Sequence, residues 1–109
     1  MQLVRRHHLQ TGRFDQQIDR IEAHRVTMAP AQVSGTHSHR GGVIGLIISG
    51  EAVLQLRGEP EHRLAAGSTF YEPPGVLVDR FDNASEEAEL EFLAFYPLLG
   101  EMPLVEFSD

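Results

Sequence analysis

The sequence predicts an all-β barrel, and three observations lead to this expectation. From Arg20 onward, short segments rich in Val, Ile, Leu and Phe are separated by Gly, Pro or Asn about every eight to twelve residues, as in small β-barrels. Within one segment Ala52, Leu54 and Leu56 alternate with Val53, Gln55 and Arg57, as in a strand with one core face and one face in a wetter environment. The chain has 109 residues and no cysteine, so one hydrophobic core must hold it without disulfides.

The first element in chain order is a polar arm over residues 1–19. Phe14 and Ile18 in the arm and Ile21 just after it lie at helical spacing, but three positions do not decide between a helix and an extended arm. The barrel domain is expected over residues 20–97, with an apolar tail over 98–109. About eight strands are expected, which is the number in a jelly roll, over residues 20–28, 33–39, 43–48, 52–57, 61–65, 69–72, 76–81 and 88–96.

Two of the expected strands are apolar on both faces, within residues 43–48 and 90–96. Such strands need cover on two sides. The barrel interior covers one side, and a partner subunit or the chain's own tail, from Leu98 to Phe107, is expected to cover the other. Because this apolar surface exceeds what a small barrel covers internally, we expect a homodimer.

The composition excludes several classes of function. A net charge of -7 argues against a nucleic-acid partner. No apolar run approaches the roughly 18–20 residues that span a bilayer, and the first ten residues lack the apolar stretch of a signal peptide. We therefore expect a soluble, cytoplasmic protein without a membrane partner. Without cysteine, histidine and carboxylate are the expected metal ligands.

The sharpest local feature is the pair His37 and His39 near the end of an expected strand. A spacing of two places both imidazoles on one face of a strand, where they could hold a divalent transition metal. Alone, such a pair is more often ordinary polarity at a loop end. The adjacent pair in the arm, His7 and His8, is expected to be solvated, and the isolated His24 and His62 are expected on the surface.

A second feature is the segment from Gly67 to Gly75, a short strand that ends in a Pro-Pro-Gly turn. Together the two features resemble the cupin superfamily, whose motifs read Gly-x5-His-x-His-x3,4-Glu-x6-Gly and Gly-x5-Pro-x-Gly-x2-His-x3-Asn. Matching positions are His37, His39 and Gly50 in the first motif and Gly67, Pro73 and Gly75 in the second. The resemblance covers residues 20–97. It implies a cupin-type double-stranded β-helix in which two histidines and a glutamate of the first motif and a histidine of the second bind one divalent metal.

Two of these four ligand positions fall on valine, because Val43 stands at the glutamate position and Val78 at the histidine position. Branched alkyl groups there make the cavity half apolar, so metal affinity is expected to fall severely. A carboxylate from elsewhere could restore the set. Asp79 is one candidate if a bulge turns it inward, and Glu72 and Asp82 are the others.

We therefore expect a cupin-fold protein that binds a small organic ligand in the barrel interior, beside His37, His39, Val43 and Val78. Metal binding through His37 and His39 is expected to be weak or absent, with Zn, Ni, Fe or Mn as the possible ions. The main alternative is a metal-dependent dioxygenase, isomerase or decarboxylase that uses both histidines as ligands. A metal-free enzyme with either histidine as base, or a structural or sensory module with a vestigial pocket, also fits the sequence.

Overall fold

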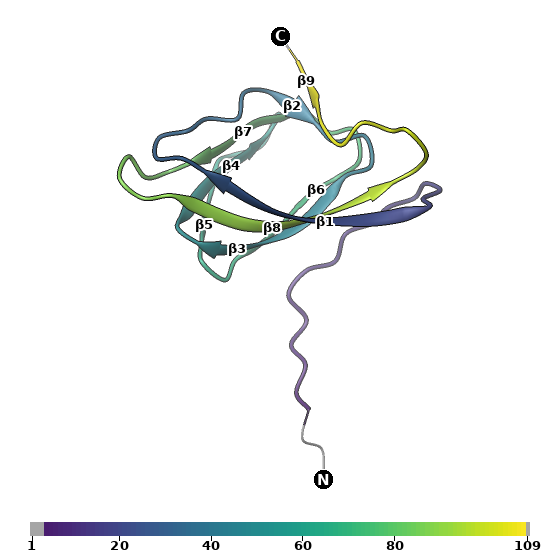
Figure 1. Ribbon diagram of the computed structural model, residues 1–109, viewed down its shortest axis with the longest axis horizontal. Coiled ribbons are helices and arrows are strands. Elements are labelled where there is room, and N and C mark those ends of the chain that lie inside the picture. Colours follow the sequence, from purple (N-terminus) through teal and green to yellow (C-terminus); the bar gives the residue numbers. More distant parts are fainter. Residues whose placement is uncertain (1–3, 109) are drawn as a thin grey trace.

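The computed structural model describes residues 4–108, and two antiparallel sheets make up the body of this part of the chain. One sheet has the strand order β1-β8-β3-β6 and the other β5-β4-β7-β2-β9. Neighbouring strands are mostly distant in sequence, as in a jelly roll, which confirms the all-β prediction. The strands are β1 (Arg20–Met28), β2 (His37–Ser38), β3 (Val43–Ser49), β4 (Glu51–Leu56), β5 (His62–Ala65), β6 (Thr69–Glu72), β7 (Val78–Asn83), β8 (Leu90–Leu98) and β9 (Glu106–Phe107) (Figure 1).

The strand expected over residues 33–39 is reduced to the two residues of β2. Gly35 adopts a positive φ of 76° and interrupts the extended backbone. Ser34 just before it bonds to β7 through both its backbone and its side chain, since its N–H donates to Asp82 and its hydroxyl accepts from the backbone N–H of Phe81. Side-chain bonds thus replace a regular ladder along this segment.

The inner faces of the two sheets form one core. Phe70, Phe81 and Phe92 pack as a cluster with ring centroids 4.8–5.7 Å apart, in the range favoured by aromatic pairs. Gly45 makes room for this cluster, because a Cβ at Gly45 would lie 2.2 Å from the Phe70 ring. The alternation of apolar residues along the strands therefore produces the expected buried interior.

The tail and the arm pack on different parts of the barrel. In the tail, Leu104 packs against the core and β9 pairs with β2, so the tail lies at one end of the barrel. The arm contacts the outer side of β6, where the Phe14 ring meets Tyr71 edge to face and the Tyr71 hydroxyl donates to the Arg13 carbonyl. Farther toward the N-terminus the arm leaves the barrel body (Figure 1). Phe95 on the outer face of β8 stays 36% exposed.

Among residues 4–108 there is no helix long and apolar enough to cross a membrane.

Candidate metal centre

Three buried side chains that can bind metal converge at one end of the barrel. His37, His39 and Glu72 each offer a ligand atom, and these atoms lie within 4.8 Å of one another. The Glu72 Oε1 lies 3.3 Å from Nε2 of His39 and 3.8 Å from Nε2 of His37. All three residues are at most 7% exposed. This cluster is called the His-His-Glu centre below.

Local structure explains why the two histidines face the same point. His37 lies on β2 and His39 follows it at a spacing of two, so both rings project from one face. The Pro-Pro-Gly turn holds the second histidine, because the N–H of Gly75 donates to the His39 carbonyl at 2.9 Å. Gly75 has a φ of 77°, which glycine adopts without strain. One hydrogen bond therefore connects the histidine pair to the Pro-Pro-Gly turn, the two features found separately in the sequence.

Both imidazoles are oriented by backbone carbonyls. Nδ1 of His37 lies 2.9 Å from the Gly35 carbonyl, and Nδ1 of His39 lies 2.8 Å from the Leu104 carbonyl. A carbonyl oxygen only accepts hydrogen bonds, so Nδ1 of each ring is the donor. In the neutral rings Nε2 is then left with a lone pair, and both Nε2 atoms point toward Glu72. Histidine ligands of metals are commonly oriented in this way.

The His-His-Glu centre therefore brings together atoms that accept hydrogen bonds and lacks a donor among them. Glu72 Oε1 is buried and has no hydrogen-bond partner. Burial lowers the pKa of His39, but interaction with the Glu72 carboxylate and the bond to the Leu104 carbonyl outweigh it, so the pKa is raised above the ordinary 6.5. Three lone-pair atoms at these distances are stabilised by a cation between them, either a proton or a metal ion.

The donor set fits a divalent transition metal. Two imidazoles and one carboxylate form the triad that holds non-heme iron and leaves further coordination positions open. Metal bonds of about 2.0–2.2 Å to N and O place neighbouring donors about 3.0–3.5 Å apart, and the carboxylate oxygen lies 3.3 and 3.8 Å from the two ring nitrogens. Only small side-chain movements would bring the three donors onto one ion.

The two valines lie beside the centre. Val43 pairs with Glu72 across β3 and β6, and Val78 pairs with His37 across β7 and β2. Residues opposite each other in a ladder project to the same side, so each valine neighbours a member of the cluster. Val43 lines the cavity described below, whereas Val78 belongs to the hydrophobic core and is not among the described residues that line this cavity.

Of the three carboxylates considered as replacements, Glu72 reaches the histidines. Asp79 pairs with Arg57 on the outside. Asp82 accepts the N–H of Ser34 and pairs with Arg80. One sequence signal pointed to Glu72, since it shares a strand face with the core residue Phe70 two positions earlier.

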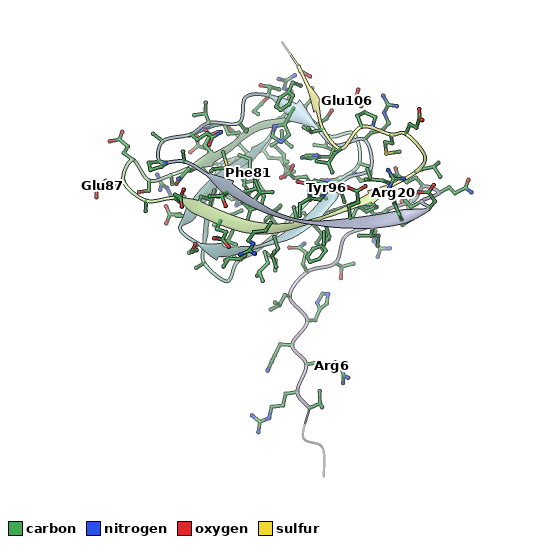
Figure 2. All side chains as sticks on the ribbon, viewed as in Figure 1. Arg6, Arg20, Phe81, Glu87, Tyr96 and Glu106 are labelled. Atoms are coloured by element: carbon green, nitrogen blue, oxygen red, sulfur yellow. The ribbon has the colours of Figure 1, made fainter. Side chains whose placement is uncertain are left out.

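The centre opens into a cavity of about 260 Å³ between the sheets. Its lining is mostly apolar and includes Met28, Phe70 and Phe92, while the exposed Val33 and Phe107 lie at its edge. Tyr96 also lines the cavity, and burial together with the charge of Glu72 raises its pKa to about 12. Figure 2 shows the labelled Phe81 and Tyr96 within the barrel and Arg20, Glu87 and Glu106 at its outside.

Comparisons with known structures agree with this architecture. A cupin-like protein from Thermotoga maritima is 25% identical, with a TM-score of 0.68, over 81% of this chain and 64% of that one. A protein from Klebsiella pneumoniae with a double-stranded β-helix domain is 19% identical, with a TM-score of 0.67, over 91% and 84% of the two chains. A DMSP lyase from Ruegeria pomeroyi is 21% identical, with a TM-score of 0.68, over 81% of this chain and 43% of the lyase.

The chain thus covers less than two-thirds of the length of the Thermotoga protein and of the lyase, and the last two similarities concern the fold alone. Among curated proteins, none matches the chain. The cupin domain family matches residues 24–96, which is most of the chain and includes β2, β3, β6, β7 and nearly all of β8. The chain therefore belongs to the cupin family.

Proposed function

We propose that this cupin binds one divalent transition metal ion, such as Fe, Ni, Zn or Mn, through His37, His39 and Glu72. A small organic ligand would bind next to the ion in the cavity. The observation that carries the proposal is the buried Glu72 Oε1, which has no hydrogen-bond partner and faces Nε2 of both histidines. An unpartnered buried carboxylate oxygen is costly, and a bound cation removes that cost.

The chain's own groups are arranged to support such a site. A bound divalent ion would act as a Lewis acid toward an oxygen of the ligand. The carbonyls of Gly35 and Leu104 hold the two imidazoles in the tautomer that binds metal. The apolar lining limits water around the centre, which strengthens electrostatic interactions there. These features support metal and ligand binding without specifying a reaction.

The expectation of weak metal binding came from the two valines and remains a prediction. Glu72 would supply a third donor from β6, while the motif resemblance puts the buried, apolar Val78 at the fourth ligand position of the family. Because affinity depends on the number and convergence of ligands, we expect binding stronger than two histidines allow and weaker than a four-ligand set provides.

A second candidate function is metal-free binding of the organic ligand. The raised pKa of His39 favours it, since a proton on Nε2 of His39 would stabilise the Glu72 carboxylate in place of a metal. In that state the His39–Glu72 pair would present a hydrogen-bond donor and a charge to the ligand. The two candidates differ in whether the protein takes up metal.

Calorimetric titration of the chelator-treated protein with Ni²⁺ or Zn²⁺ separates them. We expect one ion per chain, and we expect His39→Gln to weaken this binding strongly. His62→Gln is the matched control, because His62 is exposed and lies outside the centre. The titrations should be repeated in a His7→Gln, His8→Gln background, which removes the exposed pair in the arm. No binding, or binding unchanged by His39→Gln, would contradict the metal proposal.

A further inference from the structure

The charge and polarity of the cavity lining point to the class of ligand. Resting on the proposed metal site, we infer that the cavity takes a small, largely apolar molecule with a single anionic oxygen group, of the class of apolar monocarboxylates. The inference excludes dicarboxylates, phosphorylated compounds and sugars as preferred ligands. Its basis is what lines the cavity beyond the His-His-Glu centre.

The first argument is charge. No arginine lines the cavity among residues 4–108, and the chain has no lysine. Two neutral imidazoles, one carboxylate and a divalent ion leave one net positive charge, which one anionic group neutralises. A second anionic group would be buried without a counter-ion, which costs several kcal/mol. Arginines of the barrel pair instead with carboxylates outside the cavity lining, as in Arg20–Asp19, Arg25–Glu91, Arg40–Glu106, Arg57–Asp79, Arg63–Glu51 and Arg80–Glu61.

The second argument is hydrogen bonding. Beyond the centre and Tyr96, the polar side chains of the lining are Gln32 and Ser34. The Ser34 hydroxyl already donates to the Gly35 carbonyl and accepts from the N–H of Phe81. The Gln32 side-chain oxygen accepts from the N–H of Ala29, which leaves the NH₂ of Gln32 and the hydroxyl of Tyr96 to meet a ligand. A sugar has more hydroxyl groups than these two groups can pair, so it would bury several of them without partners, which opposes binding.

The third argument is the shape of the apolar part. Phe70 precedes Glu72 by two residues on β6 and lines the same cavity. Two residues of a strand span about 7 Å, so an oxygen group at the centre places about one ring or a short alkyl chain against Phe70. Phe92 and Met28 also line the cavity and complete an apolar pocket. A ligand with an apolar body buries this surface, and a small hydrophilic anion does not.

The experiment compares three carboxylates on the protein after it has been loaded with Ni²⁺. Metal binding is measured first by calorimetry, so that failure of the metal proposal is seen separately. Phenylacetate, acetate and succinate are then titrated into the metal-loaded and the metal-free protein. We expect phenylacetate to bind at least about tenfold more tightly than acetate, because it buries its ring, and succinate to bind no more tightly than acetate. We expect the metal-free protein to bind phenylacetate at least about tenfold more weakly.

A variant tests the charge argument directly. Val33 lines the cavity and is 68% exposed, so Val33→Arg adds a cation at the edge without burying it. We expect this variant to bind succinate at least about fivefold more tightly than the native protein, because the guanidinium can pair with the second carboxylate. Ile21→Arg is the matched control, since Ile21 is 62% exposed and does not line the cavity. It should leave all three affinities unchanged.

Three results would overturn the inference while leaving the metal site intact. One is tighter binding of succinate than of phenylacetate by the native protein. Another is equal binding of phenylacetate and acetate, which would show that the apolar wall does not contact the ligand. The third is equal binding of phenylacetate with and without metal. If the protein takes up no metal in the first titration, the proposed function itself fails, and this inference falls with it.

Discussion

Replacing Glu72 by Gln removes the one negative charge of the His-His-Glu centre and keeps the size of the side chain. The carboxylate is buried, and its Oε1 faces the Nε2 atoms of His37 and His39. An amide is a poor metal ligand beside two imidazoles, because it brings no charge to balance the ion. We therefore expect Glu72→Gln to weaken metal binding while leaving the barrel folded.

The magnitude follows from the distance between the charges. A carboxylate oxygen and a divalent ion about 2.1 Å apart attract each other by about 16 kcal/mol at an effective dielectric constant of about 20. Desolvation of the carboxylate and the ion offsets most of this attraction. We expect a net loss of about 3 kcal/mol, which is about a hundredfold in Kd.

The metal-free protein should respond in the opposite direction. Nδ1 of His39 donates to the Leu104 carbonyl, so Nε2 of the neutral ring accepts, and the NH₂ of the new amide can donate to it. The substitution also removes a buried carboxylate oxygen that lacks a partner. We expect the metal-free variant to melt at a temperature no lower than the metal-free native protein at neutral pH or above.

Calorimetric titration with Ni²⁺ and melting curves with and without the ion measure both effects. Glu106→Gln is the control, because Glu106 is a half-exposed carboxylate that pairs with Arg40 outside the centre, and surface pairs contribute about 0–1 kcal/mol. The reasoning would be refuted if Glu72→Gln bound Ni²⁺ as tightly as the native protein. It would equally be refuted if the metal-free variant were strongly destabilised, since this result would show that the Glu72 carboxylate stabilises the fold without metal.

Four further predictions concern pH, the tail, the fourth ligand position and the oligomeric state. Because the pKa of His39 is raised above 6.5, protons should compete with metal: the Kd for Ni²⁺ should rise as pH falls below that pKa and stay constant above it. In the metal-free protein the His39–Glu72 pair should stabilise the fold below about pH 6.5. Melting curves should show this stabilisation disappear as pH rises through the raised pKa. Truncation after residue 102 removes the Leu104 carbonyl that orients His39, so calorimetry should show metal binding weakened about 10–100-fold. The control is Arg40→Gln, which breaks only the surface pair between Arg40 and Glu106 of the tail and should change metal binding little. Val78→His adds an imidazole next to His37 and should tighten Ni²⁺ binding by at least about tenfold, and an unchanged Kd would show that this position does not face the centre. The homodimer expected from the sequence should give a mass of about twice 12.2 kDa in light scattering at micromolar concentration, and a mass of 12.2 kDa would contradict it.

The strand pattern could be predicted from the sequence because it depends on local information. Apolar alternation and the Gly and Pro breaks place most strands within two residues of their observed bounds. The observed β7 begins two residues later than expected, because the Pro-Pro-Gly turn extends to Val76, whose N–H donates to the Pro73 carbonyl. The short strand β9 was not predicted, since two residues carry no periodic signal and its partner β2 lies far away in sequence.

The sequence by itself determined that His37 and His39 share a strand face and that a rigid turn follows Glu72, because spacing and residue type along one segment are enough for both statements. The expectation that Val43 and Val78 lie near the two histidines came from the resemblance to the cupin motifs, because both valines are on other strands. Tertiary structure decided that Glu72 joins the centre, because the packing of the sheet that contains β6 against the sheet that contains β2 brings its carboxylate beside both rings. It also decided that the Leu104 carbonyl, 65 residues from His39, orients that imidazole. Such contacts depend on the pairing of distant segments, and no local pattern encodes which backbone oxygen will lie 2.8 Å from a ring nitrogen.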